Sequence, residues 1–79
     1  MMIVKVLGAG CTKCKLLEQR LHNLKSQYQL DIEIEKVTQL NEIMAYSVMM
    51  TPGLVIDGKL KSVGKVPPED ELLKWIREV

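Results

Sequence analysis

The chain has 79 residues, enough for one domain but close to the lower limit at which a single hydrophobic core is stable without cross-links. Its composition, 47% hydrophobic and 27% charged, is that of an ordinary soluble globular protein and excludes a disordered chain. The formal net charge is +1, with acidic and basic residues interleaved along the chain. We therefore expect no nucleic acid and no membrane surface as a partner.

The beginning of the chain does not have the pattern of a secretory signal. Residues 2–7 are too short for the apolar part of such a signal and already have the pattern of a strand. No stretch approaches the length of about 18 apolar residues that a membrane-spanning helix needs. We expect a cytoplasmic protein, in which the two cysteines serve chemistry rather than a structural cross-link.

Residues 2–7 are nearly all apolar or β-branched, which is typical of a central strand with both faces buried. Small residues, beginning with Gly8, end this strand and allow other backbone to pass closely. Residues 12–28 then have the apolar spacing of a helix. The inward arc of this helix is expected to contain Leu16, Leu17, Leu21, Leu24 and Tyr28.

The middle of the chain has a strand pattern followed by a helix pattern. Leu30, Ile32 and Ile34 alternate with acidic residues, which predicts a strand with one exposed face at an edge of the sheet. Thr38 is a candidate N-cap for a second helix that extends to about Met49. A Thr-Pro-Gly sequence then stops this helix.

The last third of the chain predicts a hairpin and then a helix. Strands at residues 54–56 and 59–63 flank Asp57 and Gly58, a pair that supplies the positive φ angles of a tight turn. Pro68 begins the final helix, and the acidic residues after it suit the helix dipole. The buried face of this helix is expected to contain Leu72, Leu73, Trp75, Ile76 and Val79. The predicted order is βαβαββα, in which the first two strands are parallel with a right-handed crossover.

Cys11 and Cys14 form a C-x-x-C motif at the start of the first helix. A helix N-terminus stabilises an anion and lowers the pKa of a cysteine thiol, so Cys11 is the candidate attacking thiolate. Cys14 lies at the margin of the inward helix face, and its separation from Cys11 lets it resolve a mixed disulfide. Lys13 and Lys15 add a modest, salt-screened positive potential. The motif therefore predicts a redox-active dithiol.

Two segments carry a resemblance to a known family. Residues 8–14, with the sequence Gly-Ala-Gly-Cys-Thr-Lys-Cys, follow the first strand, and Thr51, Pro52 and Gly53 precede the third. Together with the element order, they resemble the thioredoxin and glutaredoxin superfamily, and within it the small redox-active disulfide proteins of archaea and bacteria. The resemblance implies an α/β, minimal thioredoxin-like fold, with three helices and a four-stranded mixed sheet ordered 2-1-3-4, in a single domain over residues 1–79.

The resemblance also implies how a substrate is bound. The peptide bond before Pro52 is expected to be cis, with the proline facing the disulfide, and the backbone of Thr51 is expected to pair with an extended substrate. Gly10, Thr12 and Lys13 are expected to line the approach to the attacking sulfur. The implied activity is that of a thiol-disulfide oxidoreductase acting on protein or small disulfides. We expect a disulfide-bearing protein substrate, a reductase as electron donor, a monomeric chain and no cofactor.

A soft-metal site is the alternative interpretation of the same two thiolates. Small copper carriers also have a C-x-x-C motif between a strand and a helix, but their element order is βαββαβ, whereas this chain ends in a helix. A closed zinc site needs about four ligands, and the chain offers two cysteines and His22, which lies on another helical face. We expect no resident metal and a solvent-facing His22. Interior packing is the expected role of Met44, Met49, Met50 and Trp75.

Overall fold

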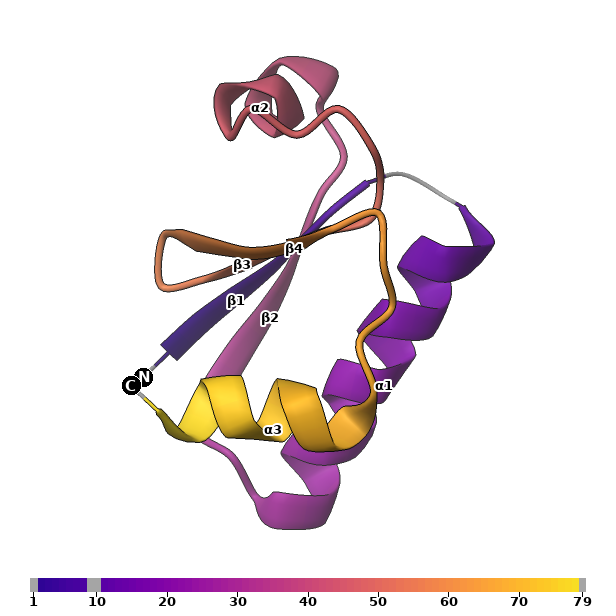
Figure 1. Cartoon of the computed structure of the whole chain (residues 1–79). Helices are drawn as coiled ribbons and strands as arrows, with labels where there is room; N and C mark the ends of the chain where they lie inside the picture. The colour runs from indigo at the N-terminus through magenta and orange to yellow at the C-terminus, as the bar shows by residue number, and fades with distance from the viewer. Residues whose placement is uncertain (1, 9–10, 79) are drawn as a thin grey trace.

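The computed structural model describes residues 2–8 and 11–78, and four strands and three helices alternate along them (Figure 1). The strands are β1 (Met2–Leu7), β2 (Ile32–Val37), β3 (Gly53–Ile56) and β4 (Lys59–Val63). The helices are α1 (Thr12–Tyr28), α2 (Leu40–Ala45) and α3 (Glu69–Arg77). This is the predicted βαβαββα order. Over the described residues, no helix combines the length and the apolar character needed to cross a membrane.

The four strands form one mixed sheet in the predicted order β2-β1-β3-β4. β1 and β2 are parallel because α1 connects them, and β3 is antiparallel to both β1 and β4. β1 and β3 are therefore the central strands, and Leu7 at the end of β1 lies opposite Gly53 at the start of β3. This pairing brings the segment that leads to the cysteines next to the segment that contains Pro52.

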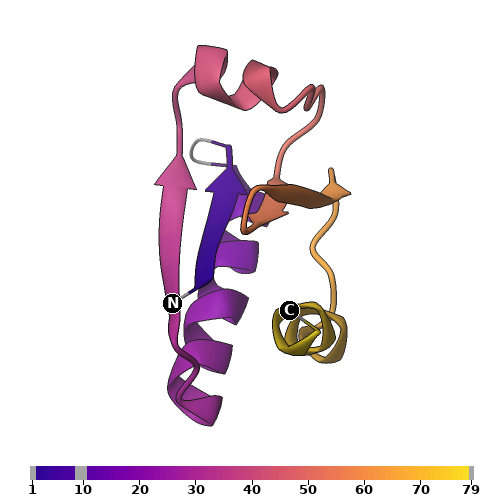
Figure 2. The same cartoon turned by 90° about the vertical axis from the view of Figure 1, so that its left-hand side faces the viewer.

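The two faces of the sheet have separate cores. α1 and α3 cover one face and lie against each other, and α2 lies over the ends of β1 and β2 (Figures 1 and 2). The larger core, under α1 and α3, consists of Val4, Val6, Leu17, Leu21, Leu24, Ile32, Leu54, Ile56, Leu72 and Ile76. The smaller core, under α2, consists of Leu7, Val37, Ile43, Val48 and Val55. β1 contributes to both, so the prediction of a strand buried on both faces is confirmed.

The hairpin between β3 and β4 turns at Asp57 and Gly58, as the sequence predicts. Both residues have positive φ angles, 47° and 82°. The Asp57 carboxylate also accepts a hydrogen bond of 2.9 Å from the backbone amide of Ile3, which ties the turn to the start of β1. A register shift between Leu54 and Val55, which no local pattern predicts, interrupts the β3–β4 ladder.

The second helix is shorter than its apolar spacing predicts. α2 begins after Gln39, whose side chain makes no capping hydrogen bond, so the expectation of a Thr38 cap is wrong. It ends at Ala45, where Tyr46 and Ser47 close a tight turn and Ser47 has a φ of 61°. A helix of this length buries only one side chain, Ile43.

Several apolar side chains expected in the interior are exposed instead. The methionines Met44, Met49 and Met50 have exposed fractions of 60%, 91% and 64%, so the prediction that they pack inside is wrong. Leu16 and Tyr28 lie at the edges of the inward arc of α1 and are about two-fifths exposed, at 40% and 42%. Trp75 packs against the larger core, in agreement with the prediction, whereas Val79 lies outside the described residues.

Candidate functional site

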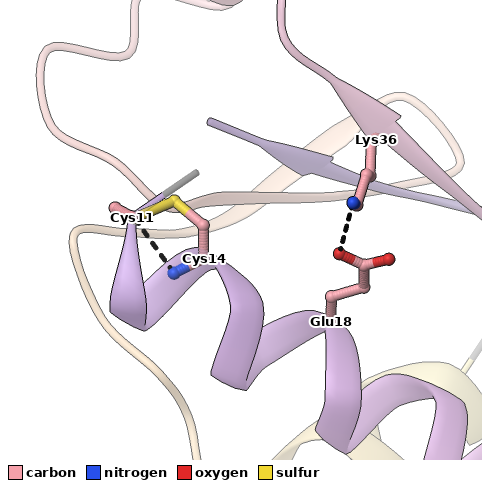
Figure 3. Close-up of a disulfide and its surroundings, with 4 residues drawn as sticks. All are labelled: Cys11, Cys14, Glu18 and Lys36. Atoms are coloured by element: carbon pink, nitrogen blue, oxygen red, sulfur yellow. Dashed lines mark hydrogen bonds and ion pairs between the residues drawn. A yellow bond between two sulfur atoms is a disulfide. The ribbon is translucent and has the colours of Figure 1, made fainter. Parts of the chain in front are cut away.

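Cys11 and Cys14 are joined by a disulfide at the start of α1, with their Cα atoms 5.1 Å apart (Figure 3). Cys11 is the N-cap residue, in an extended conformation, and its Sγ atom accepts a hydrogen bond of 3.0 Å from the backbone amide of Cys14. N-cap positions are normally occupied by side chains with an oxygen acceptor that satisfies a free helix amide. Here the sulfur takes that role, so a helix amide already points at the atom that becomes a thiolate on reduction.

The two sulfurs differ in their access to solvent. Cys14 is 4% exposed and packs toward the sheet, whereas Cys11 is partly exposed at the helix end. α1 has no acidic residue in its first turn, and both Lys13 and Lys15 in that region are exposed. A partner in solution therefore reaches the disulfide from the Cys11 side. The two lysines give this side a positive potential.

Gly8 fills the space between the disulfide and the segment before β3. The residue is buried and has a φ of 146°. A Cβ atom at this position would lie 2.6 Å from Sγ of Cys14 and 3.0 Å from Cβ of Thr51. Only glycine fits between the two, so Gly8 lets Thr51 and the buried sulfur approach the same point. The sequence predicts that Gly8 ends the strand and lets other backbone pass closely, but it does not show that the neighbours are Cys14 and Thr51.

Pro52 and Thr51 stand on the other side of this contact. The Thr51–Pro52 peptide bond is cis, Pro52 is fully buried and Thr51 is exposed. The carbonyl oxygen of Pro52 accepts a hydrogen bond of 2.8 Å from the amide of Gly64, which holds the loop after β4 beside it. Met50 covers Gly64, because a Cβ atom there would lie 3.3 Å from the methionine Cε.

A pair of charged side chains lies one helical turn beyond Cys14. Glu18 forms an ion pair of 3.3 Å with Lys36 of β2, and its other carboxylate oxygen lies 3.7 Å from Nε2 of His22 (Figure 3). Glu18, Lys36 and Cys14 all line a small cavity of about 50 Å³. No local sequence pattern predicts this group, because its members come from α1 and β2 and meet only when the crossover is formed.

The remaining predicted residues lie as follows. Thr12 and Lys13 are exposed on the first turn of α1, adjacent to the disulfide. Gly10 lies outside the described residues. His22 is exposed, as expected, although it also approaches the Glu18 carboxylate. Across residues 2–8 and 11–78, no three His, Cys, Asp or Glu side chains gather in a way that would hold a metal ion.

The sequence and the fold are similar to those of known thioredoxins. A thioredoxin from Methanothermobacter thermautotrophicus is 32% identical over 74 residues, which cover 94% of this chain and 96% of that protein. A thioredoxin from Methanocaldococcus jannaschii is 33% identical over 77 residues, which cover 98% of this chain and 88% of that protein.

Among solved structures, thioredoxin-2 of the malaria parasite superposes with a TM-score of 0.76 at 16% identity, covering 100% of this chain and 84% of that one. Mitochondrial thioredoxin 3 from Saccharomyces cerevisiae superposes with a TM-score of 0.69 at 23% identity, covering 99% and 78%. At these identities the two structures show the shared fold alone.

Fold, disulfide position and sequence similarity all agree with the family model described as a thioredoxin domain, which matches residues 2–77. The chain therefore belongs to the thioredoxin domain family, and its function is that of a thiol-disulfide oxidoreductase.

Proposed function

We propose that Cys11 is the attacking cysteine and Cys14 the resolving cysteine of this oxidoreductase. The observation that carries this assignment is the difference in exposure between the two cysteine residues, 4% for Cys14 against a partly exposed Cys11. The amide of Cys14, which donates to Sγ of Cys11, supports it because the same donor stabilises a thiolate at Cys11.

The proposed reaction is reduction of a substrate disulfide in two exchanges. The Cys11 thiolate attacks one substrate sulfur, forms a mixed disulfide and releases the other substrate sulfur as a thiolate. Cys14 then loses its proton and attacks Sγ of Cys11, which forms the internal disulfide and releases the second substrate thiolate. Two electrons pass from the dithiol to the substrate, and a reductase restores the dithiol.

The proposed substrate surface surrounds the exposed side of the disulfide. Thr51 is exposed beside the buried Pro52, and its backbone is the element proposed to pair with an extended substrate. Thr12 and Lys13 are exposed on the other side of the motif, and Gly10 completes the proposed approach in the sequence. We propose a protein disulfide as substrate, a cytoplasmic location and a monomeric chain that needs no cofactor.

The alternative, a soft-metal carrier, finds no specific support. The late β3–β4 hairpin and the C-terminal α3 differ from the βαββαβ order of the small copper carriers. The two cysteines are paired with each other across the helix start.

Equilibration with glutathione redox buffers tests the proposed function. The chain is incubated over a range of reduced-to-oxidised glutathione ratios, quenched with acid and weighed intact by mass spectrometry. We expect a reversible, two-electron conversion between dithiol and internal disulfide, and a Cys11→Ser/Cys14→Ser double variant provides the blank. A wild-type chain that never forms the internal disulfide across the whole range contradicts the proposal.

A further inference from the structure

A small cavity lies beside Cys14, between the first turns of α1 and the ends of β1 and β2. Its volume is about 50 Å³, which is enough for one water molecule, whose share of liquid volume is about 30 Å³. The lining residues are Val6, Gly8, Cys14, Lys15, Glu18, Lys36 and Thr38. Cys14 therefore shares this cavity with one acidic residue, Glu18, and with two lysines.

Helix geometry places Glu18 on the same face of α1 as Cys14. Residues four apart on a helix are neighbours, and Figure 3 shows the disulfide and the Glu18 carboxylate both on the sheet side of α1. The Glu18 side chain is only 23% exposed, and Lys36 holds its carboxylate from β2 at 3.3 Å. This carboxylate is thus partly removed from solvent and held by Lys36, and Glu18 lines the same cavity as Cys14.

From this arrangement we propose that Glu18 is the general base for Cys14, and that Lys36 is the residue that positions it. The resolving cysteine must lose a proton before it attacks, and a buried thiol has little direct access to solvent bases. β1 contains no acidic residue, and Glu18 is the one acid among the described residues that line the cavity. The inference rests on the proposed roles of the two cysteines.

The step is balanced without any further reactant. The Cys14 S–H proton passes to the Glu18 carboxylate, directly or through one water in the cavity, while the sulfur bonds to Sγ of Cys11. The bond between Cys11 and the substrate sulfur breaks, and the substrate leaves as a thiolate that takes a proton from solvent. Glu18 then passes the proton to solvent, and when the internal disulfide is reduced again the Cys14 thiolate takes up a proton from solvent.

Three other charged groups face Glu18 and enter its pH dependence. Lys36 approaches from β2, His22 approaches from the next turn of α1 at 3.7 Å, and Lys15 lines the same cavity. His22 carries charge only when it is protonated. A His22→Gln variant is therefore measured alongside the others, so that the contribution of the imidazole is separated from that of the Glu18 carboxylate.

Reaction of the reduced protein with dithio-bis-nitrobenzoate separates the two exchanges. Attack by Cys11 releases one thionitrobenzoate, and attack by Cys14 on the mixed disulfide then releases the second. For Glu18→Gln we expect the second phase to be about tenfold slower near pH 6, with the first phase unchanged. The difference should become smaller as the pH rises, because hydroxide then deprotonates the thiol without a carboxylate base.

Two variants make this result specific to the carboxylate at position 18. Glu18→Asp keeps a carboxylate and should retain more of the second-phase rate than Glu18→Gln does. Glu33→Gln removes an exposed acid of β2 that does not line the cavity, and it should behave as wild type.

The inference is overturned if Glu18→Gln leaves the second phase unchanged, slows it equally at every pH, or slows both phases together. Release of only one thionitrobenzoate by the wild-type chain at every pH contradicts the cysteine roles themselves. A wild-type chain with both phases and an unaffected Glu18→Gln variant contradicts only the role of Glu18.

Discussion

The backbone amide of Cys14 donates a hydrogen bond of 3.0 Å to Sγ of Cys11. The same amide would stabilise a thiolate at Cys11 in the reduced protein, and Cys11 is the more exposed of the two residues. We predict that brief treatment of the reduced protein with iodoacetamide at neutral pH labels Cys11 much faster than Cys14. Peptide mass mapping measures the ratio, and preferential labelling of Cys14 would reverse the assigned roles.

Gly8 is predicted to be the most sensitive glycine of the site. Gly8→Ala places a methyl group 2.6 Å from Sγ of Cys14 and requires an L residue at a φ of 146°, so we expect a loss of about 3 kcal/mol in the free energy of unfolding. Because the methyl group also displaces the sulfur or Thr51, disulfide exchange should slow. Urea unfolding and the dithio-bis-nitrobenzoate assay measure the two effects.

Gly58→Ala is the matched control for that variant. Gly58 also has a positive φ, 82°, but an added Cβ atom there meets nothing within 4 Å. The cost should be that of the backbone conformation alone, about 1 kcal/mol, with an unchanged rate of exchange. Equal effects of the two variants on exchange would show that Gly8 has no special contact with the disulfide.

Asp57 is predicted to contribute to stability but not to exchange. Asp57→Ala removes the acceptor of the Ile3 amide and places alanine at a φ of 47°, so the two losses together should cost about 2 kcal/mol. Asp57→Asn keeps an oxygen acceptor and tolerates this φ, so its stability should stay close to that of wild type. Thermal unfolding distinguishes the two, and a large loss with asparagine would contradict the importance of the acceptor.

The redox and metal interpretations differ in what Pro52 does. Pro52 is fully buried in the segment that meets the disulfide. We therefore expect the Pro52→Ala variant to show slower disulfide exchange than the wild-type chain and a Cu(I) affinity that is no lower. The wild-type chain should bind Cu(I) no better than an ordinary vicinal dithiol in competition with a Cu(I) chelator. Isolation of the chain with stoichiometric copper or zinc would contradict the redox interpretation.

The sequence predicted the fold well because its signals are local. The Asp57–Gly58 turn, the small residues after β1 and the alternation in β2 each depend on a few neighbouring residues. The strand order follows because few arrangements satisfy short, right-handed connections. The exposed methionines were predicted wrongly because helical spacing shows that a side chain lies on one face and does not show that anything covers that face.

The cysteine pair could be predicted from spacing, whereas its surroundings could not. The approach of Gly8 to Thr51 and the ion pair of Glu18 with Lys36 both join residues that are distant in sequence. Such contacts depend on the register of the strands and on how closely a helix packs against the sheet. A local sequence pattern predicts neither of these. In the sequence, Gly8 cannot be told from a glycine that only ends a strand, and Glu18 cannot be told from a glutamate that faces solvent.

Trapping of a mixed disulfide tests the central assignment most directly. Cys14→Ser and Cys11→Ser variants are each reduced, mixed with a protein that contains an accessible disulfide, quenched with acid and separated without reductant. Only Cys14→Ser keeps an attacking sulfur and lacks a resolving one, so we predict that this variant accumulates a covalent complex and that Cys11→Ser does not. Equal trapping by both variants, or trapping by Cys11→Ser alone, would contradict the account.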